Sequence, residues 1–524
     1  MISVIIPPVS DCFMPTLGAA QITAYLKQQG IATKLYDMGA EFQRVLLQEG
    51  VLVARDFASL EKSVLRRYAT ITSTLFSDES IKFMISYDSF SSSWNWREPT
   101  NLEELLSTHK ELLPYITRMP SFLEVADSAY AAFSISFESQ LIPALLIAVQ
   151  LRKVRNIPII FGGSFFYNYE NAFIKIFATL NIVDCLIIGP GELILASIGR
   201  VGILETVSSG KFAVNDIFGK KLFRQGQWKS CPIVYMPDFT DLEFSRYFST
   251  VKAFPYMLRN ICYYGRCKFC NGDRDCGIVQ IKELRKAFRS MSQIAKTCNI
   301  HNVYIVDAGL SPCDFRMITE MEENFPFEWI ANARFEKALE RDELIYKLRQ
   351  KGCRMLRFGL ESGSQRILNL MNKGTDVSVA ASILQKLHVA GILTHVYLMF
   401  GYFGENSADR EETLQFLERN RCYIDSYSVS IFQPIPGTPV YEEILTKFSG
   451  INPRGAEEEY QLVLSTVYPC ESEYQDILKT VDSVKRLLMG YAHTNAEFYS
   501  ANIFSAEQLC AEQEERISIQ FMPL

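Results

Sequence analysis

Residues 328–361 read EWIANARFEKALERDELIYKLRQKGCRMLRFGLE, and their pattern favours one arrangement of secondary structure. The short apolar runs at 328–334 and 354–361 have the composition of β-strands. Between them, residues 337–352 carry apolar side chains at helical spacing and end at a glycine, which is typical of a helix C-terminus. A strand, a helix and a second strand in this order predict a βαβ unit with parallel strands.

The same alternation extends through the second half of the chain. Further strands are expected at residues 256–262, 303–309, 394–402 and 425–432. Together these six βα units predict a partial TIM-type (β/α)6 barrel over residues 251–445, with ligand sites at the carboxyl ends of its strands. Residues 446–524 are mixed in pattern and are predicted to form a mainly helical C-terminal region.

The first block of the chain also alternates strands and helices. It predicts an α/β fold over residues 1–200, namely an N-terminal doubly wound, Rossmann-like parallel sheet with a helical insertion at about 39–128. Glycine turns follow two of its expected strands, in IPIIFGG and IVDCLIIGPGE, and such turns mark the ligand-binding edge of a parallel sheet. Residues 201–250 are predicted to be a linker with short strands.

Composition excludes several classes of partner. The chain has 524 residues and a net charge of −6, which disfavours a nucleic-acid-coating role. No apolar run has membrane-spanning length, and the N-terminus MISVIIPPVSDCFMP is interpreted as a buried strand and not as a signal peptide. The thirteen cysteines lack the density of a secreted scaffold, so we expect a cytoplasmic protein without nucleic-acid or membrane partners.

One loop concentrates cysteines. Residues 261–273, ICYYGRCKFCNGD, place Cys262, Cys267 and Cys270 at spacings of four and two intervening residues. Three thiolates can hold three irons of a cubane cluster and leave the fourth iron open to a small molecule. Cys276 could instead complete a closed four-ligand zinc site. The loop alone leaves both possibilities open, together with buried cysteines that bind nothing.

Longer runs around this loop resemble radical S-adenosylmethionine (SAM) enzymes of the class with an N-terminal cobalamin-binding-type domain (class B methyltransferase-like). The cysteine loop is similar to the signature of that family, although the first spacing is four residues where the family usually has three. Residues 331–374 resemble its third and fourth βα units, residues 401–417 its fifth-strand block, and residues 434–444 the block after its sixth strand. The resemblance covers most of residues 1–445.

The resemblance implies a 4Fe–4S cluster held by Cys262, Cys267 and Cys270, with SAM bound at its open iron. The residues implied to contact SAM are Phe269, Asp307, Ala308, Gly309, Arg334, Glu361, Ser362, Gly401 and Glu405. Other roles remain open for some of them. Arg334 and Glu361 could form a buried ion pair with each other, Gly401 and Gly404 could only shape a turn, and Pro436, Gly437 and Thr438 could mainly end a strand.

In the resembling class the first domain cradles the lower face of a corrinoid. The residues implied to contact it are Thr16, Leu17, Gly18, Ser134, Ser136, Gln140, Gly162, Gly163, Gly189 and Glu192. Short side chains and glycines there would let the backbone approach a large flat ligand. The sequence has no D-x-H-x-x-G motif, and His109 is the only histidine before residue 301. We therefore expect a corrinoid without a histidine ligand, or a domain that kept the fold and lost the vitamin.

The resemblance implies a radical SAM enzyme that methylates an unactivated carbon of a natural-product or peptide precursor with the help of cobalamin. Its partners would be that small-molecule or peptide substrate and an external electron donor, flavodoxin- or ferredoxin-like. One alternative is a cobalamin-independent radical SAM enzyme that catalyses an oxidation, a rearrangement or a cross-link. A second alternative is a zinc-stapled binding protein without catalytic activity.

Overall fold

The computed structural model divides the chain into two compact units, with the boundary at residues 256/257 and residues 293–300 grouped with the first unit. Each unit is described by itself. The residues that the structure describes are 1–10, 14–48, 83–85, 90–92, 94, 101–119, 121–168, 174, 176, 179–217, 219–224, 236–247, 252–258, 262–270, 284–448, 456–488 and 493–494.

The first unit is built on a seven-stranded sheet with the order β2-β1-β5-β6-β7-β9-β8. The strands are β1 (Ile2–Ile6), β2 (Thr33–Asp37), β5 (Tyr130–Ser134), β6 (Ile159–Gly162), β7 (Cys185–Ile188), β8 (Ala213–Ile217) and β9 (Lys220–Arg224). All neighbours pair in parallel except β8, which is antiparallel to β9. All five residues of β1 are buried, as expected for a mainly apolar strand that is covered on both faces.

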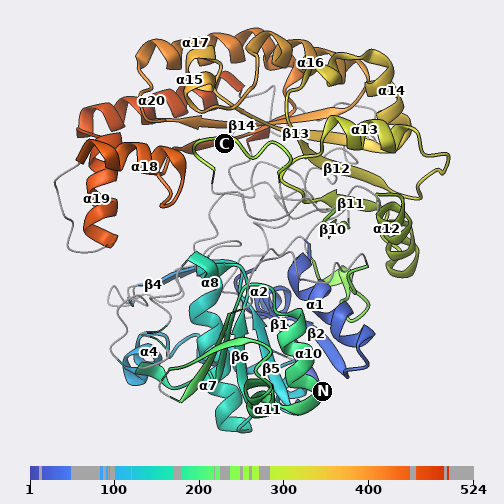
Figure 1. Ribbon diagram of the computed structural model, residues 1–524, viewed down its shortest axis with the longest axis vertical. Coiled ribbons are helices and arrows are strands. Elements are labelled where there is room, and N and C mark those ends of the chain that lie inside the picture. Colours follow the sequence, from blue (N-terminus) through green and yellow to red (C-terminus); the bar gives the residue numbers. More distant parts are fainter. Residues whose placement is uncertain are drawn as a thin grey trace. The chain divides into compact units, whose positions relative to one another are not determined.

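Helices cover both faces of this sheet (Figure 1). Helix α1 (Leu17–Gln28) packs beside α10 (Glu192–Val201), and α7 (Leu141–Val154) packs against α5 (Leu113–Thr117) and α6 (Ser121–Ala126). Helix α1 ends as expected at Gly30, whose φ of +73° suits glycine and lets the amide of Ile31 reach the carbonyl of Leu26 at 3.0 Å. The predicted doubly wound sheet is confirmed.

The strand order reverses between β1 and β5. In doubly wound sheets the connections then leave on opposite faces and open a crevice at the carboxyl ends of those two strands, which is where ligands bind. The segments Pro7–Ser10, after β1, and Ile135–Gln140, after β5, lie at this switch point.

Residues 201–250 differ from the expected linker. They contain α11 (Ile203–Ser208) and the hairpin of β8 and β9, which extends the first sheet. Leu222 and Phe223 of β9 are buried in the process, and their burial explains why the hairpin joins the sheet. In the region expected as a helical insertion, the structure shows α2 (Met38–Gln48), α4 (Leu102–Thr108), α5 and α6, but also a small hairpin of β3 (Phe83–Ile85) and β4 (Phe90–Ser92).

The second sheet has the order β10-β11-β12-β13-β14-β15-β16 and is the expected partial barrel. The strands are β10 (Phe254–Tyr256), β11 (Asn302–Ile305), β12 (Glu328–Ala333), β13 (Cys353–Glu361), β14 (Leu393–Phe400), β15 (Ser426–Ile431) and β16 (His493–Thr494). The pairings from β11 to β16 are parallel. The short strand β16 was not expected.

Helices follow the strands of this sheet along its outer side (Figure 1). They are α13 (Pro312–Thr319), α14 (Asp342–Gln350), α15 (Gln365–Leu370), α16 (Val377–Val389), α17 (Ser407–Asn420) and α18 (Pro439–Leu445), and α12 (Leu284–Cys298) precedes β11 in the chain. Side chains satisfy their first amides, as Asp376 does for α16 and Asn406 for α17. The expected helical C-terminal region is represented by α19 (Ala456–Val467) and α20 (Glu471–Leu488). Among the described residues, no helix is long and apolar enough to cross a membrane.

Candidate functional site

The cysteine loop begins a few residues after β10, at the carboxyl end of the first barrel strand. Cys262, Cys267 and Cys270 form no disulfide, and the amide of Cys270 donates to the carbonyl of Cys267 at 3.4 Å in a tight turn. The loop is braced on the residues that follow α15. The amide of Lys268 donates to the carbonyl of Met371 at 2.9 Å, and the hydroxyl of Tyr264 donates to that of Asn372 at 2.8 Å. Cys276 lies outside the described residues.

Within the described part of the chain, no three His, Cys, Asp or Glu side chains converge on a point where one metal ion would sit. This does not count against a cubane cluster, because its three cysteine ligands bind three different irons and need not converge. What the loop offers is a set of three thiols on one rigidly supported segment. That donor set suits an iron–sulfur cluster with one open corner.

Two cations stand beside the central thiol. Arg334 Nη1 lies 3.8 Å from Cys267 Sγ, and the charge of Lys373 also acts on this thiol. Burial raises the pKa of Cys267, while Lys373 and Arg334 oppose that rise. Since the thiolate is the form that binds iron, the two cations favour the ligand form of a buried cysteine.

Arg334 is held by the loop and by the turn after α15. Its guanidinium lies 3.5 Å from the centre of the Tyr264 ring, donates to the carbonyl of Lys373, and is 3.4 Å from Glu336. Its side chain is only 5% exposed. The alternative in which Arg334 pairs with Glu361 is not realised, because Glu361 has a different partner.

Glu361 forms an ion pair with Lys373, with 2.8 Å between Oε1 and Nζ. Both side chains are about nine-tenths buried, at 12% and 9% exposure. Gly359 makes room for the pair, since a Cβ there would overlap the carboxylate and the ammonium group. Lys373 was not among the residues expected at the site. Nothing in the local pattern marks it, because the helix and turn that carry it to the strand end are determined by packing.

The expected SAM residues on the second strand have structural partners. Asp307 is buried, and its Oδ2 accepts from the amide of Leu258 at 2.7 Å, which ties the exit of β10 to the exit of β11. Ala308 is exposed, and a Cβ on the buried Gly309 would contact the ring of Tyr263 at 3.8 Å. The three residues therefore lie at the strand end next to the cysteine loop, as their positions in the sequence predict.

The fourth and fifth strand ends are also well braced. The hydroxyl of Ser362 is 3.0 Å from that of Thr413 on α17. Gly401 has a φ of +78°, and its amide donates to Glu405 Oε2 at 2.6 Å. Burial raises the pKa of Glu405 to about 7, and its other oxygen has no partner among the described residues. An unpaired buried carboxyl oxygen is costly, which fits a group that meets a polar ligand.

The remaining expected positions are Phe269, next to Lys373, and residues 436–438, after the sixth strand. Phe269 packs edge-on against Tyr402 and lies beneath the ammonium group of Lys373, 5.5 Å from the ring centre. At the sixth strand end, Gly437 has a φ of +80° and Thr438 caps α18 by accepting from the amide of Tyr441 at 3.4 Å. Since β15 ends at Ile431, Pro436–Thr438 do not end the strand; they lead into α18, with Thr438 as its N-cap.

The expected corrinoid residues all follow carboxyl ends of strands in the first sheet or start the next helix. They are Thr16, Leu17 and Gly18 at the start of α1, Ser134 as the last residue of β5 with Ser136 and Gln140 after it, Gly162 as the last residue of β6 with Gly163 after it, and Gly189 and Glu192 after β7. Parallel strands bring these ends to one edge of the sheet. This edge is the one that contains the β1–β5 switch point.

Gln140 has a structural task at this edge. Its amide group donates to the carbonyl of Pro7 at 3.0 Å, and its oxygen accepts from the amides of Ser136 and Phe137. The side chain is fully buried and so joins the loops after β1 and β5. Gly163 has a φ of +120°, and a Cβ there would overlap the carbonyl of Ile135, so only glycine fits.

Two buried hydroxyl groups at the same edge bear on whether a ligand fits there. Within the described residues, Ser10 Oγ and Thr16 Oγ1 are buried and have no hydrogen-bond partner. Unsatisfied buried hydroxyls are uncommon in native proteins and often mark the place of an absent water or ligand. The edge therefore fits a ligand with polar groups.

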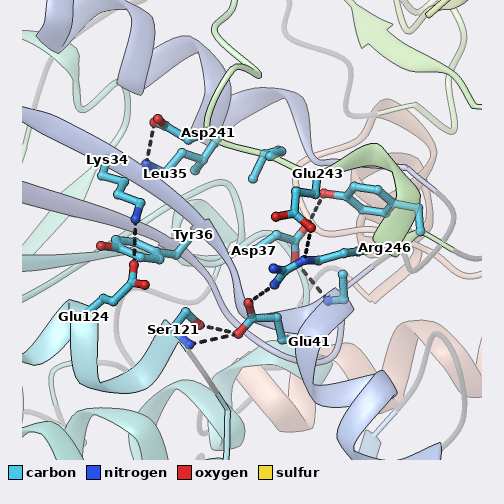
Figure 2. A pocket seen from close by; sticks show the side chains of 13 residues that line it. Lys34, Leu35, Tyr36, Asp37, Glu41, Ser121, Glu124, Asp241, Glu243 and Arg246 are labelled. Carbon is cyan, nitrogen blue, oxygen red and sulfur yellow. Dashed lines mark hydrogen bonds and ion pairs between the residues drawn. The ribbon is translucent and has the colours of Figure 1, made fainter. Parts of the chain in front are cut away.

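A separate pocket of about 200 Å³ lies at the carboxyl end of β2 (Figure 2). It is lined by Lys34, Tyr36, Asp37 and Glu41 together with residues 241–243, 246 and 247, among others, and contains none of the expected site residues. Its polar groups are engaged with one another: Tyr247 donates to Asp37 at 2.6 Å, and Arg246 pairs with Glu41. Sequence reasoning gave no sign of this pocket.

Residues 258–417 match the family described as the Radical SAM superfamily. The matched range contains the cysteine loop and the strand ends that carry Asp307, Arg334, Glu361 and Gly401. This part of the chain is thus a radical SAM domain, and such domains use a 4Fe–4S cluster and SAM. The reading as a non-catalytic, zinc-stapled protein is thereby wrong.

Two curated relatives illustrate the range of the family. Bacteriochlorophyllide d C-12(1)-methyltransferase of Chlorobaculum tepidum is 28% identical over 134 residues, which is 25% of this chain and 29% of that protein. tRNA-2-methylthio-N(6)-dimethylallyladenosine synthase of Acetivibrio thermocellus is 25% identical over 259 residues, 47% of this chain and 51% of that protein. The chain thus matches at most about half the length of these relatives.

Solved structures share the fold over a longer range. The radical SAM methyltransferase TsrM from Kitasatospora setae, solved with cobalamin and a [4Fe–4S] cluster bound, is similar with a TM-score of 0.54 at 15% identity, over 86% of this chain and 78% of TsrM. The cobalamin-dependent radical SAM enzyme OxsB, with aqua-cobalamin bound, has a TM-score of 0.51 at 13% identity, over 98% of this chain and 61% of OxsB. At these identities the likeness concerns the fold.

Proposed function

We propose that the protein is a cobalamin-dependent radical SAM methyltransferase that methylates an unactivated carbon of a small-molecule or peptide precursor. One observation supports this most directly. A radical SAM domain is joined to a doubly wound sheet whose switch-point edge carries a glycine that no other residue can replace and two buried hydroxyls without partners. Two buried hydroxyls without partners would lower the stability of a domain that binds no ligand.

In the second unit, the chain's own residues bind and orient the reactants. Cys262, Cys267 and Cys270 would hold the cluster, which, when bound and reduced, supplies the 5′-deoxyadenosyl radical from SAM. The Glu361–Lys373 pair would exchange its internal contact for contacts with the charged and hydroxyl groups of SAM. Glu405 Oε1, which is buried and unpaired, would accept from a donor of the same ligand.

In the first unit, the loops after β1, β5 and β6 would hold the corrinoid. Gln140 fixes the first two loops relative to each other, and Gly163 allows the third to lie directly against Ile135. Thr16 and Ser10 would donate to polar groups of the ligand. Cobalamin bound there would supply a methyl group for the substrate.

Product stoichiometry tests the proposal. The purified protein would be given SAM, a reductant, a candidate precursor and methylcobalamin in an amount far below that of the precursor, and the products of many turnovers would be quantified by mass spectrometry. We expect one 5′-deoxyadenosine and one S-adenosylhomocysteine for each methylated product, because one SAM starts the radical and another restores the methyl donor. Deoxyadenosine and product without S-adenosylhomocysteine would contradict the methyltransferase proposal.

A cobalamin-independent reaction is the second candidate. It is favoured by the relative from Acetivibrio thermocellus, which matches 47% of this chain and whose name, tRNA-2-methylthio-N(6)-dimethylallyladenosine synthase, mentions no corrinoid. In that case the protein should turn over fully without any corrinoid. The same assay, run with and without methylcobalamin, separates the two candidates.

A further inference from the structure

Tyr264 lies in the cysteine loop between Cys262 and Cys267, and its ring lies against the guanidinium of Arg334. The Cζ atom of that guanidinium is 3.5 Å from the ring centre, and the side chain of Arg334 is buried. A cation over an aromatic face is attracted to the ring, and more strongly when it is shielded from water. Tyr264 is not among the residues expected at the site, so this contact adds a residue to it.

The position of the Tyr264 ring is fixed by the turn after α15. Its hydroxyl donates to the carbonyl of Asn372 at 2.8 Å, and the side-chain amide of Asn372 donates to the carbonyl of Arg266 in the loop at 3.0 Å. Gly374 leaves room for the tyrosine, because a Cβ there would lie 2.4 Å from the hydroxyl oxygen. The ring therefore has a defined place between the loop and this turn.

Arg334 is held beside a cluster ligand by the same contacts. Its Nη2 donates to the carbonyl of Lys373, and its Nη1 lies 3.8 Å from Cys267 Sγ. A guanidinium is planar and its N–H donors have fixed directions. The ring that fixes the plane of the guanidinium thus also fixes the approach of Nη1 to the sulfur.

We propose that Tyr264 is a positioning residue that raises the reduction potential of the cluster by holding Arg334 beside Cys267. Reduction adds one electron, and so one negative charge, to the cluster. Hydrogen bonds to its sulfurs and positive charge nearby favour the reduced form and raise the potential. The inference rests on the proposed function, because only a bound cluster has a potential to set.

The contacts of Tyr264 indicate that it acts through Arg334. Its side chain is uncharged, and the single hydrogen of its hydroxyl is donated to Asn372, so that hydrogen is not offered to a cluster sulfur. The ring could also act on its own by excluding water from the cluster, since solvent exposure influences the potential. A double variant separates these two effects.

Redox titrations of the full-length protein, reconstituted with its cluster and kept without SAM, provide the test. The midpoint potential is followed by EPR in the wild type, in Tyr264→Leu, Tyr264→Phe and Arg334→Gln, and in the double variant Tyr264→Leu/Arg334→Gln. Tyr346→Leu is the matched control, because Tyr346 is an exposed tyrosine on α14.

We expect Tyr264→Leu to lower the ratio of reduced to oxidised cluster about tenfold at a fixed solution potential. For one electron this is a shift of about 59 mV to more negative potential. Tyr264→Phe keeps the ring and should titrate near the wild type, as should the control. The double variant should titrate with Arg334→Gln alone, because without the guanidinium the ring has nothing to hold.

A wild-type potential in Tyr264→Leu, an equal shift in Tyr264→Phe or in the control, or shifts that add up in the double variant would overturn the inference. If Tyr264→Leu binds no iron, Tyr264→Met, whose long apolar side chain keeps the packing, replaces it in the titration. Loss of iron there too would also overturn the inference, because it would assign Tyr264 to the folding of the loop. Failure of the proposed function would look different: the wild type would bind no iron, or would hold the cluster and form no S-adenosylhomocysteine.

Discussion

At the scale of single residues, the site is organised by cations next to a thiol. Arg334 and Lys373 both act on Cys267, and each is connected to the other through the carbonyl of Lys373. Lys373 also holds Glu361, so one lysine links the cysteine loop to the fourth strand end. Such a network fixes the cluster ligands in position relative to the groups that would contact SAM.

The cysteines give the first prediction. Alanine at Cys262, Cys267 or Cys270 should abolish the brown absorbance of the reconstituted protein, because three ligands are needed to hold a cluster with one open iron. Alanine at Cys276 should leave the absorbance and its SAM-dependent EPR change intact. Loss of metal in Cys276→Ala as severe as in the other three, with zinc as the metal present, would contradict this assignment.

Glu361 gives the second prediction. In Glu361→Gln the amide oxygen can still accept from Lys373, so the variant should fold, bind iron and melt near the wild-type temperature. Loss of one charge-assisted hydrogen bond to SAM costs roughly 1.5–3 kcal/mol, so we expect about a tenfold to hundredfold weaker SAM binding in equilibrium dialysis. A variant that fails to fold while Lys373→Gln folds normally would instead assign the carboxylate to the framework.

At the scale of elements, residues 236–247 bind along the edge of the first sheet. Asp241 accepts from the amide of Leu35 on edge strand β2 at 2.9 Å, and Lys27 of α1 pairs with Asp238 and Asp241. Figure 2 shows how Asp37, Glu41 and Arg246 continue this connection around the pocket. An edge strand covered in this way is protected from pairing with other chains.

Asp37 gives the third prediction, for the pH dependence of stability. Burial raises its pKa to about 6, above the usual value for an aspartate, so the folded state holds this proton more tightly than the unfolded state. Its contribution therefore lowers the free energy of unfolding as pH rises from about 4 to 6. In Asp37→Asn this loss should be absent. The free energy of unfolding of the variant, relative to that of wild type, should therefore be about 1–2 kcal/mol higher at pH 7 than at pH 4.5.

Urea unfolding of the full chain at both pH values measures this gain. The amide oxygen of Asn can still accept from the amides of Gly39 and Ala40, as Asp37 does at 3.0 and 3.1 Å, so the turn is kept. A difference between variant and wild type that is constant with pH would refute the assignment to Asp37.

Glycine at the first-sheet edge gives the fourth prediction. Gly163→Ala should destabilise the protein by about 2 kcal/mol or more, because its φ of +120° and the carbonyl of Ile135 leave no place for a Cβ. Gly18→Ala is the control, since a Cβ there meets nothing within 4 Å. Thermal melts check both, and equal melting temperatures would contradict the account. Weaker corrinoid binding by the stable Gly18→Ala would in addition support the contact proposed for that residue.

Periodicity predicted the strands and helices well, because each is encoded in a short stretch. The six barrel strands are expected from their apolar runs, and Gly30 ends α1 as its position predicts. What sequence reasoning missed depends on distant partners. β9 joins the sheet because Leu222 and Phe223 find β7, and Lys373 reaches Glu361 only once α15 is packed. The hydrogen bond between Asp241 and Leu35 was also missed, because it joins residues that are more than two hundred positions apart.

At the scale of the whole molecule, the chain combines two units with separate cores and separate ligand edges. In the first unit the parallel strands end at the edge that contains the β1–β5 switch point. In the second unit the strands end beside the cysteine loop. The two units match two chemical tasks, since one edge would present a methyl donor and the other would generate the radical. The proposed reaction needs both, and loss of either ligand should stop methylation while leaving the other unit folded.

The most direct test of this account is the cofactor content of one sample. The protein would be purified without oxygen, reconstituted with iron, sulfide and hydroxocobalamin, and desalted, and its iron, sulfide, zinc and corrinoid would be measured together. We expect about four irons and four sulfides, and about one corrinoid, for each chain, with negligible zinc. Iron and sulfide without corrinoid would contradict the role of the first unit, and zinc in place of iron would contradict the account as a whole.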